Sequence, residues 1–206
     1  MIFLHSSYDV WGVLASVLIA SVASYVTLDL ARRVRQPDRL AALLWWFGGS
    51  LVMGTGIWSM HFVGMLAFSL PIRLGYTPGL TAASFVAAVF TSGVALGIAS
   101  LGRLGLARVL VGAGVMGLGI CAMHYTGMAA LDMAPGIVWN MGWVAVSAAI
   151  AVGASGVALW LFFWLRGFQG LRGWLYQIAA AAVMGLAIAG MHYAGMAAAS
   201  FPLDAV

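Results

Sequence analysis

Six long apolar runs, separated by five short polar breaks, organise the chain. Each run has about the 20 apolar residues that a helix needs to cross the hydrocarbon core of a bilayer. The pattern therefore predicts six transmembrane helices, at about 10–31, 41–68, 79–101, 105–131, 138–165 and 174–200. The breaks are too short for a soluble domain. We predict an all-α protein, a polytopic membrane helical bundle that forms a single domain over residues 1–206.

A pattern of methionine, glycine and histidine recurs in the second, fourth and sixth of these runs. Each copy begins Met-Gly, ends Met-His, and continues with an aromatic residue and then Gly-Met; the copies occupy 53–65, 116–128 and 184–196. The chain is thus predicted to consist of three helical-hairpin repeats, at about 1–71, 72–135 and 136–202. Because the three motif helices run in the same direction, we predict a pseudo-threefold bundle with these helices at its centre.

Composition and charge agree with a membrane protein. Apolar residues make up 64% of the chain and charged residues 7%, whereas soluble domains carry about 25% charged residues. The basic residues are all arginine and form no cluster, so nucleic acid is not an expected partner. The single cysteine, Cys121, excludes an intrachain disulfide and is expected to be buried and inert.

The arginines also predict an orientation. Arg73 lies alone on one side, and eight lie in the breaks after the first, third and fifth helices: Arg32, Arg33, Arg35, Arg39, Arg103, Arg108, Arg166 and Arg172. Cytoplasmic loops carry an excess of Lys and Arg. We therefore predict that the eight arginines face the cytoplasm and that the N-terminus lies outside.

The residue types of the repeated pattern are ligands for soft metal ions. At about 100° per residue, the histidine, its neighbouring methionines and two glycines fall on one helix face, and glycine lets helices approach closely. We predict that the three faces form one metal site in the outer half of the membrane, reachable from outside. The predicted ligands are His61, His124, His192, Met60, Met65, Met123, Met128, Met191 and Met196. The alternatives are structural hydrogen bonds for the histidines and simple packing for the methionines.

Imidazole and thioether ligands favour copper, as Cu(I), over Mg²⁺ or Ca²⁺. Tyr125 and Tyr193 follow two of the histidines, and we predict that they contact the cofactor site by orienting its ligands; packing is the alternative. A haem b held by His/His or His/Met pairs is a second possible cofactor. Transport of copper or another solute, and a purely structural bundle that recruits a partner, are further alternatives to sensing.

Three tetrapeptides within the pattern carry a family resemblance: Met60-His61-Phe62-Val63, Met123-His124-Tyr125-Thr126 and Met191-His192-Tyr193-Ala194. They resemble the MHYT family of bacterial integral-membrane sensor domains, and the second copy spells the name in full. The resemblance implies a signal-transducing sensor of the bacterial inner (cytoplasmic) membrane, with copper as the proposed ligand and O2, CO or NO as the sensed gas.

The same resemblance implies a cytoplasmic output domain for cyclic-di-GMP synthesis or hydrolysis, or a histidine kinase. No catalytic motif of these domains occurs in the chain, so we expect this chain not to be an enzyme. Six spans would return the chain to the outside. We therefore expect either a seventh helix beyond Val206 in a longer parent, or a stand-alone sensor that acts through partners.

Overall fold

The computed structural model describes residues 3–35, 37–72, 74–101 and 105–203. Arg73, Arg103 and the end of the chain after residue 203 lie outside these ranges. The described residues form six long helices: α1 (Val10–Arg33), α2 (Arg39–Ala67), α3 (Pro78–Ser100), α4 (Leu106–Ala129), α5 (Met141–Leu165) and α6 (Gly170–Ala197). All six are long and apolar enough to cross a membrane. The predicted all-α bundle of six spans is confirmed, with helix ends within a few residues of the predicted ones.

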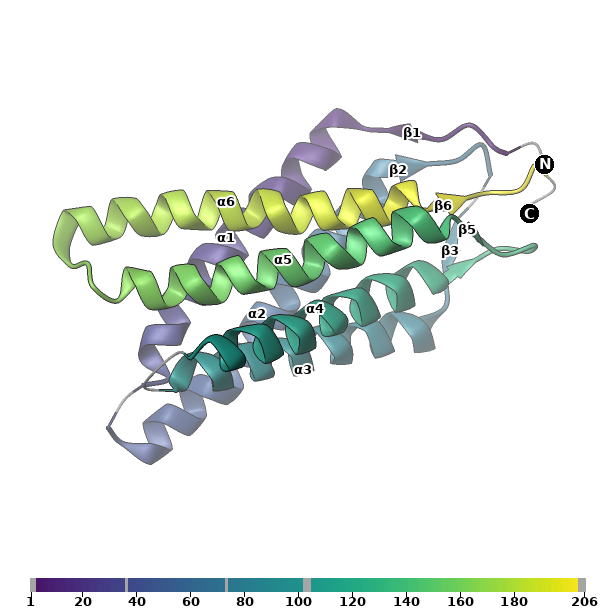
Figure 1. Cartoon of the computed structure of the whole chain (residues 1–206). Coiled ribbons are helices and arrows are strands. Elements are labelled where there is room, and N and C mark those ends of the chain that lie inside the picture. Colours follow the sequence, from purple (N-terminus) through teal and green to yellow (C-terminus); the bar gives the residue numbers. More distant parts are fainter. Residues whose placement is uncertain (1–2, 36, 73, 102–104, 204–206) are drawn as a thin grey trace.

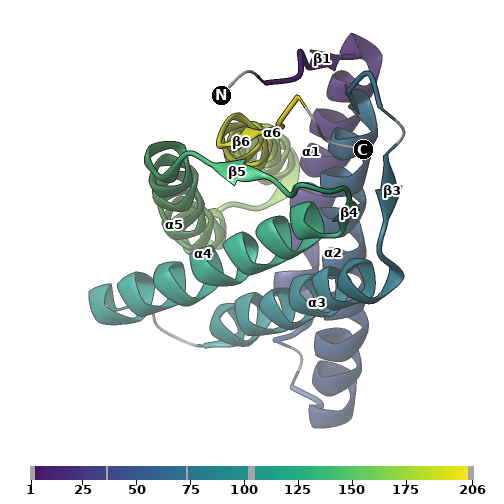
Figure 2. The same ribbon diagram turned by 90° about the vertical axis from the view of Figure 1, so that its right-hand side faces the viewer.

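The helices form a closed ring. Each helix packs against the next one along the chain, and α6 packs against α1 (Figure 1). The motif helices α2, α4 and α6 also contact one another across the centre of this ring. Figure 2 shows the ring after a quarter turn, with α1 and α2 on one side and α5 and α6 on the other. The repeat in the sequence thus becomes three similar helix pairs around one axis.

Glycine permits these close contacts at equivalent positions. A Cβ on Gly54 of α2 would lie 2.6 Å from the Cα of Val89 in α3. A Cβ on Gly117 of α4 would lie 2.8 Å from the Cα of Val152 in α5, and Gly185 of α6 meets the backbone of α1 in the same way. Real side chains do not fit at such distances. The glycine seven residues before each motif histidine therefore fixes how closely a motif helix approaches its neighbour.

Polar side chains define several helix starts. The Asp9 carboxylate accepts a hydrogen bond from the backbone of Gly12, and Asp38 does the same for Leu40. The Asn140 side chain accepts from two backbone groups at the start of α5. These caps pair N–H groups that a helix start leaves free.

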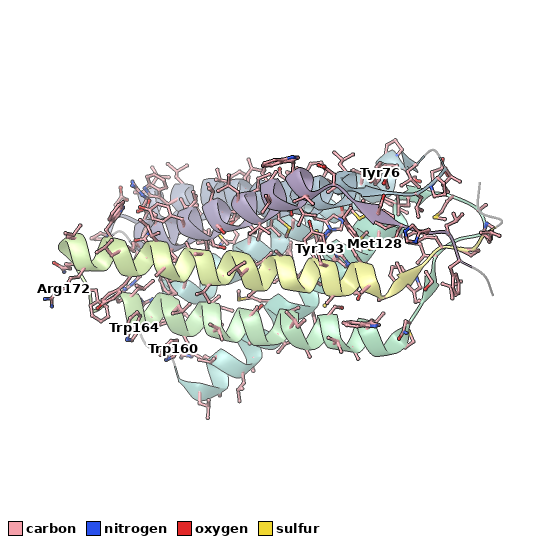
Figure 3. The ribbon with its side chains drawn as sticks, turned by 90° about the horizontal axis from the view of Figure 1, so that it is seen from above. Tyr76, Met128, Trp160, Trp164, Arg172 and Tyr193 are labelled. Carbon is pink, nitrogen blue, oxygen red and sulfur yellow. The ribbon has the colours of Figure 1, made fainter. Side chains whose placement is uncertain are left out.

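A small β cap closes one end of the bundle, where the described ends of the chain also meet. It consists of three antiparallel strand pairs: β1 (Ser7–Tyr8) with β2 (Phe68–Ser69), β3 (Gly75–Tyr76) with β4 (Leu131–Asp132), and β5 (Val138–Trp139) with β6 (Ala199–Ser200). Each pair joins the strand before one helix hairpin to the strand after it. The described arginines lie toward the opposite end, as Arg172 does in Figure 3.

The outward surface of the bundle is apolar. Large side chains such as Trp11, Phe90 and Leu106 are each more than 70% exposed. In water such a surface would drive association, whereas lipid tails cover it at no cost. The lipid bilayer is therefore the environment that this surface fits.

Candidate metal centre

Three histidines meet on the axis of the bundle, in the half nearer the β cap. His61 of α2, His124 of α4 and His192 of α6 are 0%, 1% and 1% exposed. Their ring centroids lie 5.0, 5.0 and 5.1 Å apart, and the ring planes are close to perpendicular, at 81°, 86° and 90°. The predicted convergence of the motif histidines is confirmed; metal binding by them stays a prediction.

The Nδ1 atoms point toward one another. Nδ1 of His61 lies 3.1 Å from Nδ1 of His192 and 3.2 Å from Nδ1 of His124. One ligand atom from each ring lies within 4.8 Å of the other two. An ion held by three nitrogens at about 2.0 Å, with tetrahedral angles, sets those nitrogens about 3.3 Å apart. The spacing of the rings therefore fits a single small metal ion.

The opposite edge of each ring lies against a glycine of the next motif helix. Nε2 of each ring is buried and has no hydrogen-bond partner among the described residues. The ring of His61 lies against Gly127, that of His124 against Gly195 and that of His192 against Gly64; a Cβ at any of the three would overlap the ring. The glycine three residues after each histidine thus makes room for the imidazole of another helix, in cyclic order.

Protonation explains why this arrangement suits a cation. A neutral imidazole carries one N–H and one lone pair. With the proton on Nε2, three Nδ1 lone pairs point at one place and repel one another unless a cation accepts them. With protons on Nδ1 of His124 and His192, both rings can instead donate to Nδ1 of His61, which is the structural alternative stated above. The orphaned Nε2 atoms also lack the partner that usually fixes a metal-bound histidine, so here helix packing must hold the rings.

The six methionines predicted as ligands occupy two layers. Met60, Met123 and Met191 line a cavity of about 20 Å³ together with the histidines, which is room for about one water-sized guest. Met65, Met128 and Met196 are buried one turn nearer the cap, in an apolar cluster that includes Phe68 and Phe201. Figure 3 shows Met128 and Tyr193 inside the bundle toward the cap end.

These layers overturn one expectation. The predicted site was reachable from outside, but the histidines are enclosed and the outer methionine layer is covered by side chains of the β cap. The reason is that the residues after each motif helix turn inward and pair as strands. The periodicity of the helices does not predict this β cap.

Hydrogen bonds beside the site differ between the repeats. The Tyr193 hydroxyl lies 2.7 Å from Ser16 Oγ of α1, and Tyr125 pairs with Ser147 of α5 in the same way. Each serine uses its own proton on a backbone carbonyl, so the tyrosine donates. In the first repeat Phe62 has no hydroxyl. There the Trp58 indole donates instead, to Ser84 Oγ of α3 at 3.1 Å.

The tyrosines therefore contact the histidines by their rings. Tyr125 and Tyr193 lie edge-on to the histidine that precedes each of them, with centroids 4.9 and 4.8 Å apart. Their hydroxyls bond to α5 and α1. A role for these tyrosines in orienting the ligands stays a prediction, and the contact available for it is that between the rings. Sequence reasoning missed the serine partners, although a serine recurs at the seventh position of α1, α3 and α5, as Ser16, Ser84 and Ser147. Cys121, expected to be buried, is partly exposed.

The sequence of the chain matches a family model over three segments, each of which begins in a motif helix. The model is MHYT, described as a bacterial signalling protein N-terminal repeat, and it matches residues 54–112, 117–172 and 185–206. The fold and the histidine cluster define a membrane-embedded module with three repeats. The chain belongs to the MHYT family of bacterial signalling proteins.

Several curated proteins are similar along nearly the whole chain. The bifunctional diguanylate cyclase/cyclic di-GMP phosphodiesterase MucR of Pseudomonas aeruginosa is 54% identical over 97% of this chain and 29% of that protein. The signaling protein YkoW of Bacillus subtilis is 40% identical over 98% of the chain and 25% of its own length. The cyclic di-GMP phosphodiesterase NbdA of P. aeruginosa is 39% identical over 88% and 23%. The chain thus spans about a quarter of these relatives. No solved structure matches it.

Proposed function

We propose that this chain is a membrane sensory domain that binds one copper ion through His61, His124 and His192. The observation that supports this proposal is the convergence of three buried Nδ1 atoms, of which two pairs lie 3.1 and 3.2 Å apart. A bound cation would accept the three Nδ1 lone pairs, which otherwise face one another.

The donor set favours Cu(I). Three neutral imidazoles and the nearby thioethers of Met60, Met123 and Met191 add no negative charge to the site. A divalent ion would keep both charges inside an apolar bundle, which is expensive in a membrane, whereas Cu(I) brings only one. Soft thioethers select Cu(I) over harder ions. A haem b fits less well, because a cavity of about 20 Å³ cannot hold a porphyrin unless the helices move apart.

A three-histidine site leaves one position for a small ligand. The bound ion would supply a coordination position for O2, CO or NO. The chain's own residues exclude water from this position, because Met65, Met128 and Met196 cover it toward the β cap. The isoleucines Ile57, Ile120 and Ile188 line its other side. The site is therefore suited to a small apolar ligand.

The signal would leave through the motif helices. Every described arginine lies toward the end opposite the β cap, which the positive-inside rule assigns to the cytoplasm; the N-terminus would then lie outside. The relatives named above act on cyclic di-GMP or are signalling proteins. We expect a cyclic-di-GMP or kinase output domain at the cytoplasmic end. Ligand binding would shift the equilibrium between two packings of α2, α4 and α6, and the output domain would respond to that shift. The chain itself would then not be an enzyme.

Metal analysis of the purified protein tests the ligand assignment. The chain reconstituted in lipid nanodiscs should bind one copper per chain, and the double variant His124→Ala/His192→Ala should retain less than a tenth of it. His5→Ala is the matched control, because His5 is exposed near the described start of the chain. Undiminished copper in the double variant would refute the assignment. An intense Soret band in the visible spectrum would identify the cofactor as haem instead of copper.

A further inference from the structure

A second cavity lies below the histidines, on the side away from the β cap. Its volume is about 80 Å³, and it is separated from the histidine cavity by Ile57, Ile120 and Ile188, which line both. The first methionine of each motif copy, Met53, Met116 and Met184, also lines it. The axis of the bundle therefore holds two spaces joined at one layer of isoleucines.

The lining of this cavity suits an apolar guest. Most lining residues are Met, Ile or Ala, and three carry hydroxyls. Ser24 and Thr27 already donate to carbonyls of their own helix, while Ser155 Oγ has no partner among the described residues. A buried water needs about two to four polar partners, and apolar cavities stay dry and accept xenon or small hydrocarbons. The cavity's volume of about 80 Å³, compared with about 20 Å³ at the histidines, is room for one diatomic molecule.

A lipid-facing groove adjoins the cavity from the side. This groove of about 340 Å³ lies between α1 and α2, and exposed Leu18, Val22 and Val52 line it. Ala23 and Met53 line both the groove and the cavity. A single layer of side chains therefore separates the hydrocarbon core of the bilayer from the axis of the protein.

Met53 is the movable part of this layer. It is the member of the inner methionine set that also lines the groove. Methionine is unbranched and has three rotatable bonds, so it can swing aside without a backbone shift. Ala23 cannot, because it lies against Gly56, where a Cβ would come within 2.8 Å of the Ala23 Cβ.

We propose that the cavity is a docking site for one small apolar molecule of diatomic size, which enters from the bilayer past Met53 and reaches the histidines through the isoleucine layer. The cap closes the alternative route from outer water. Apolar gases concentrate in hydrocarbon, so a lateral entrance supplies them at a higher concentration than an aqueous one. The last step, arrival at the histidines, rests on the proposed function; the cavity and its entrance do not.

Xenon binding to the metal-free chain in nanodiscs tests the cavity. Xenon NMR should show one saturable site in the wild type and at least tenfold weaker binding in Ala158→Leu and in Ser155→Leu, which fill the cavity from α5. Ala149→Leu is the control, because this alanine is exposed on the same helix. A wild type without a saturable site, or folded filled variants that bind xenon as the wild type does, would overturn the proposal.

The rate of xenon exchange tests the entrance. Met53→Phe should slow exchange about tenfold relative to Met116→Phe, since both substitutions take similar space in the cavity but only Met53 also lines the α1/α2 groove. Equal exchange rates in the two variants would overturn the lateral route. The same preparations are afterwards titrated with copper. A chain that binds xenon but takes up no copper would refute only the proposed function, and a chain that takes up copper but binds no xenon would refute only this inference.

Discussion

The first repeat and the other two place the same histidine with different side chains around it. In the second and third repeats, Tyr125 and Tyr193 donate to serines of a neighbouring helix. In the first, Phe62 has no hydroxyl and Trp58 reaches the equivalent serine from one turn earlier. The histidine triangle is nonetheless close to equilateral. The position of each ring is therefore set by what all repeats share, namely the glycines, and not by the tyrosine hydroxyl.

The largest effect should follow from removing a shared glycine. In Gly127→Ala the new Cβ would lie 2.9 Å from Cδ2 of His61 and still closer to Nε2. Overpacking of this kind costs about 1–3 kcal/mol, and displacement of the ring should lower copper affinity at least tenfold. Copper titration and thermal unfolding in nanodiscs measure both.

Gly114→Ala is the control for this variant. Gly114 lies on the same helix with nothing within 4 Å of an added Cβ, and alanine should leave copper binding unchanged while adding up to about 1 kcal/mol of helix stability. Wild-type copper affinity in Gly127→Ala would show that the glycines do not position the rings.

A smaller effect is expected when the second repeat is made to resemble the first. Tyr125→Phe removes the hydroxyl that donates to Ser147, and one such hydrogen bond contributes about 1 kcal/mol. Unfolding free energy should fall by about that much, while copper affinity should stay within twofold. A tenfold loss of affinity would instead assign the tyrosine a direct part in orienting the ligands. Tyr125→Phe/Ser147→Ala completes a double-mutant cycle.

The smallest effect concerns the β cap over the first repeat. Burial, and secondarily the charge of Tyr193, raise the pKa of Tyr8 from 10.0 to about 12. Tyr8 ionises more readily in the unfolded chain than in the folded one. The stability that the neutral Tyr8 side chain contributes is therefore present below pH 10 and is lost as the pH rises to about 12. Thermal melting of the wild type should fall more steeply over this interval than that of Tyr8→Phe. Parallel curves would contradict the link.

The sequence predicted the helices and the convergence of histidines because both depend on periodic residues. A run of about 20 apolar residues leaves few alternatives to a spanning helix. The sequence also identifies Gly64, Gly127 and Gly195 as positions of close helix packing. It does not predict that each of them contacts the imidazole of another helix, because that contact depends on how α2, α4 and α6 are rotated relative to one another.

The β cap could not be foreseen for a different reason. Strands of two residues, such as Ser7–Tyr8 and Phe68–Ser69, have no alternation to detect, and their partners lie about 60 residues away. The inner cavity was equally invisible, because it results from the space that Met53, Met116 and Met184 leave between helices.

The cyclic order of ring and glycine has a mechanical consequence. The ring of His61 contacts α4, that of His124 contacts α6, and that of His192 contacts α2. If one of these helices twists about its long axis, its imidazole pushes the next helix, which pushes the third, which returns the push to the first. A displacement of one ring is thus transmitted to the other two motif helices in cyclic order. A guest no larger than a single atom, bound between the rings, could in this way displace all three motif helices at once.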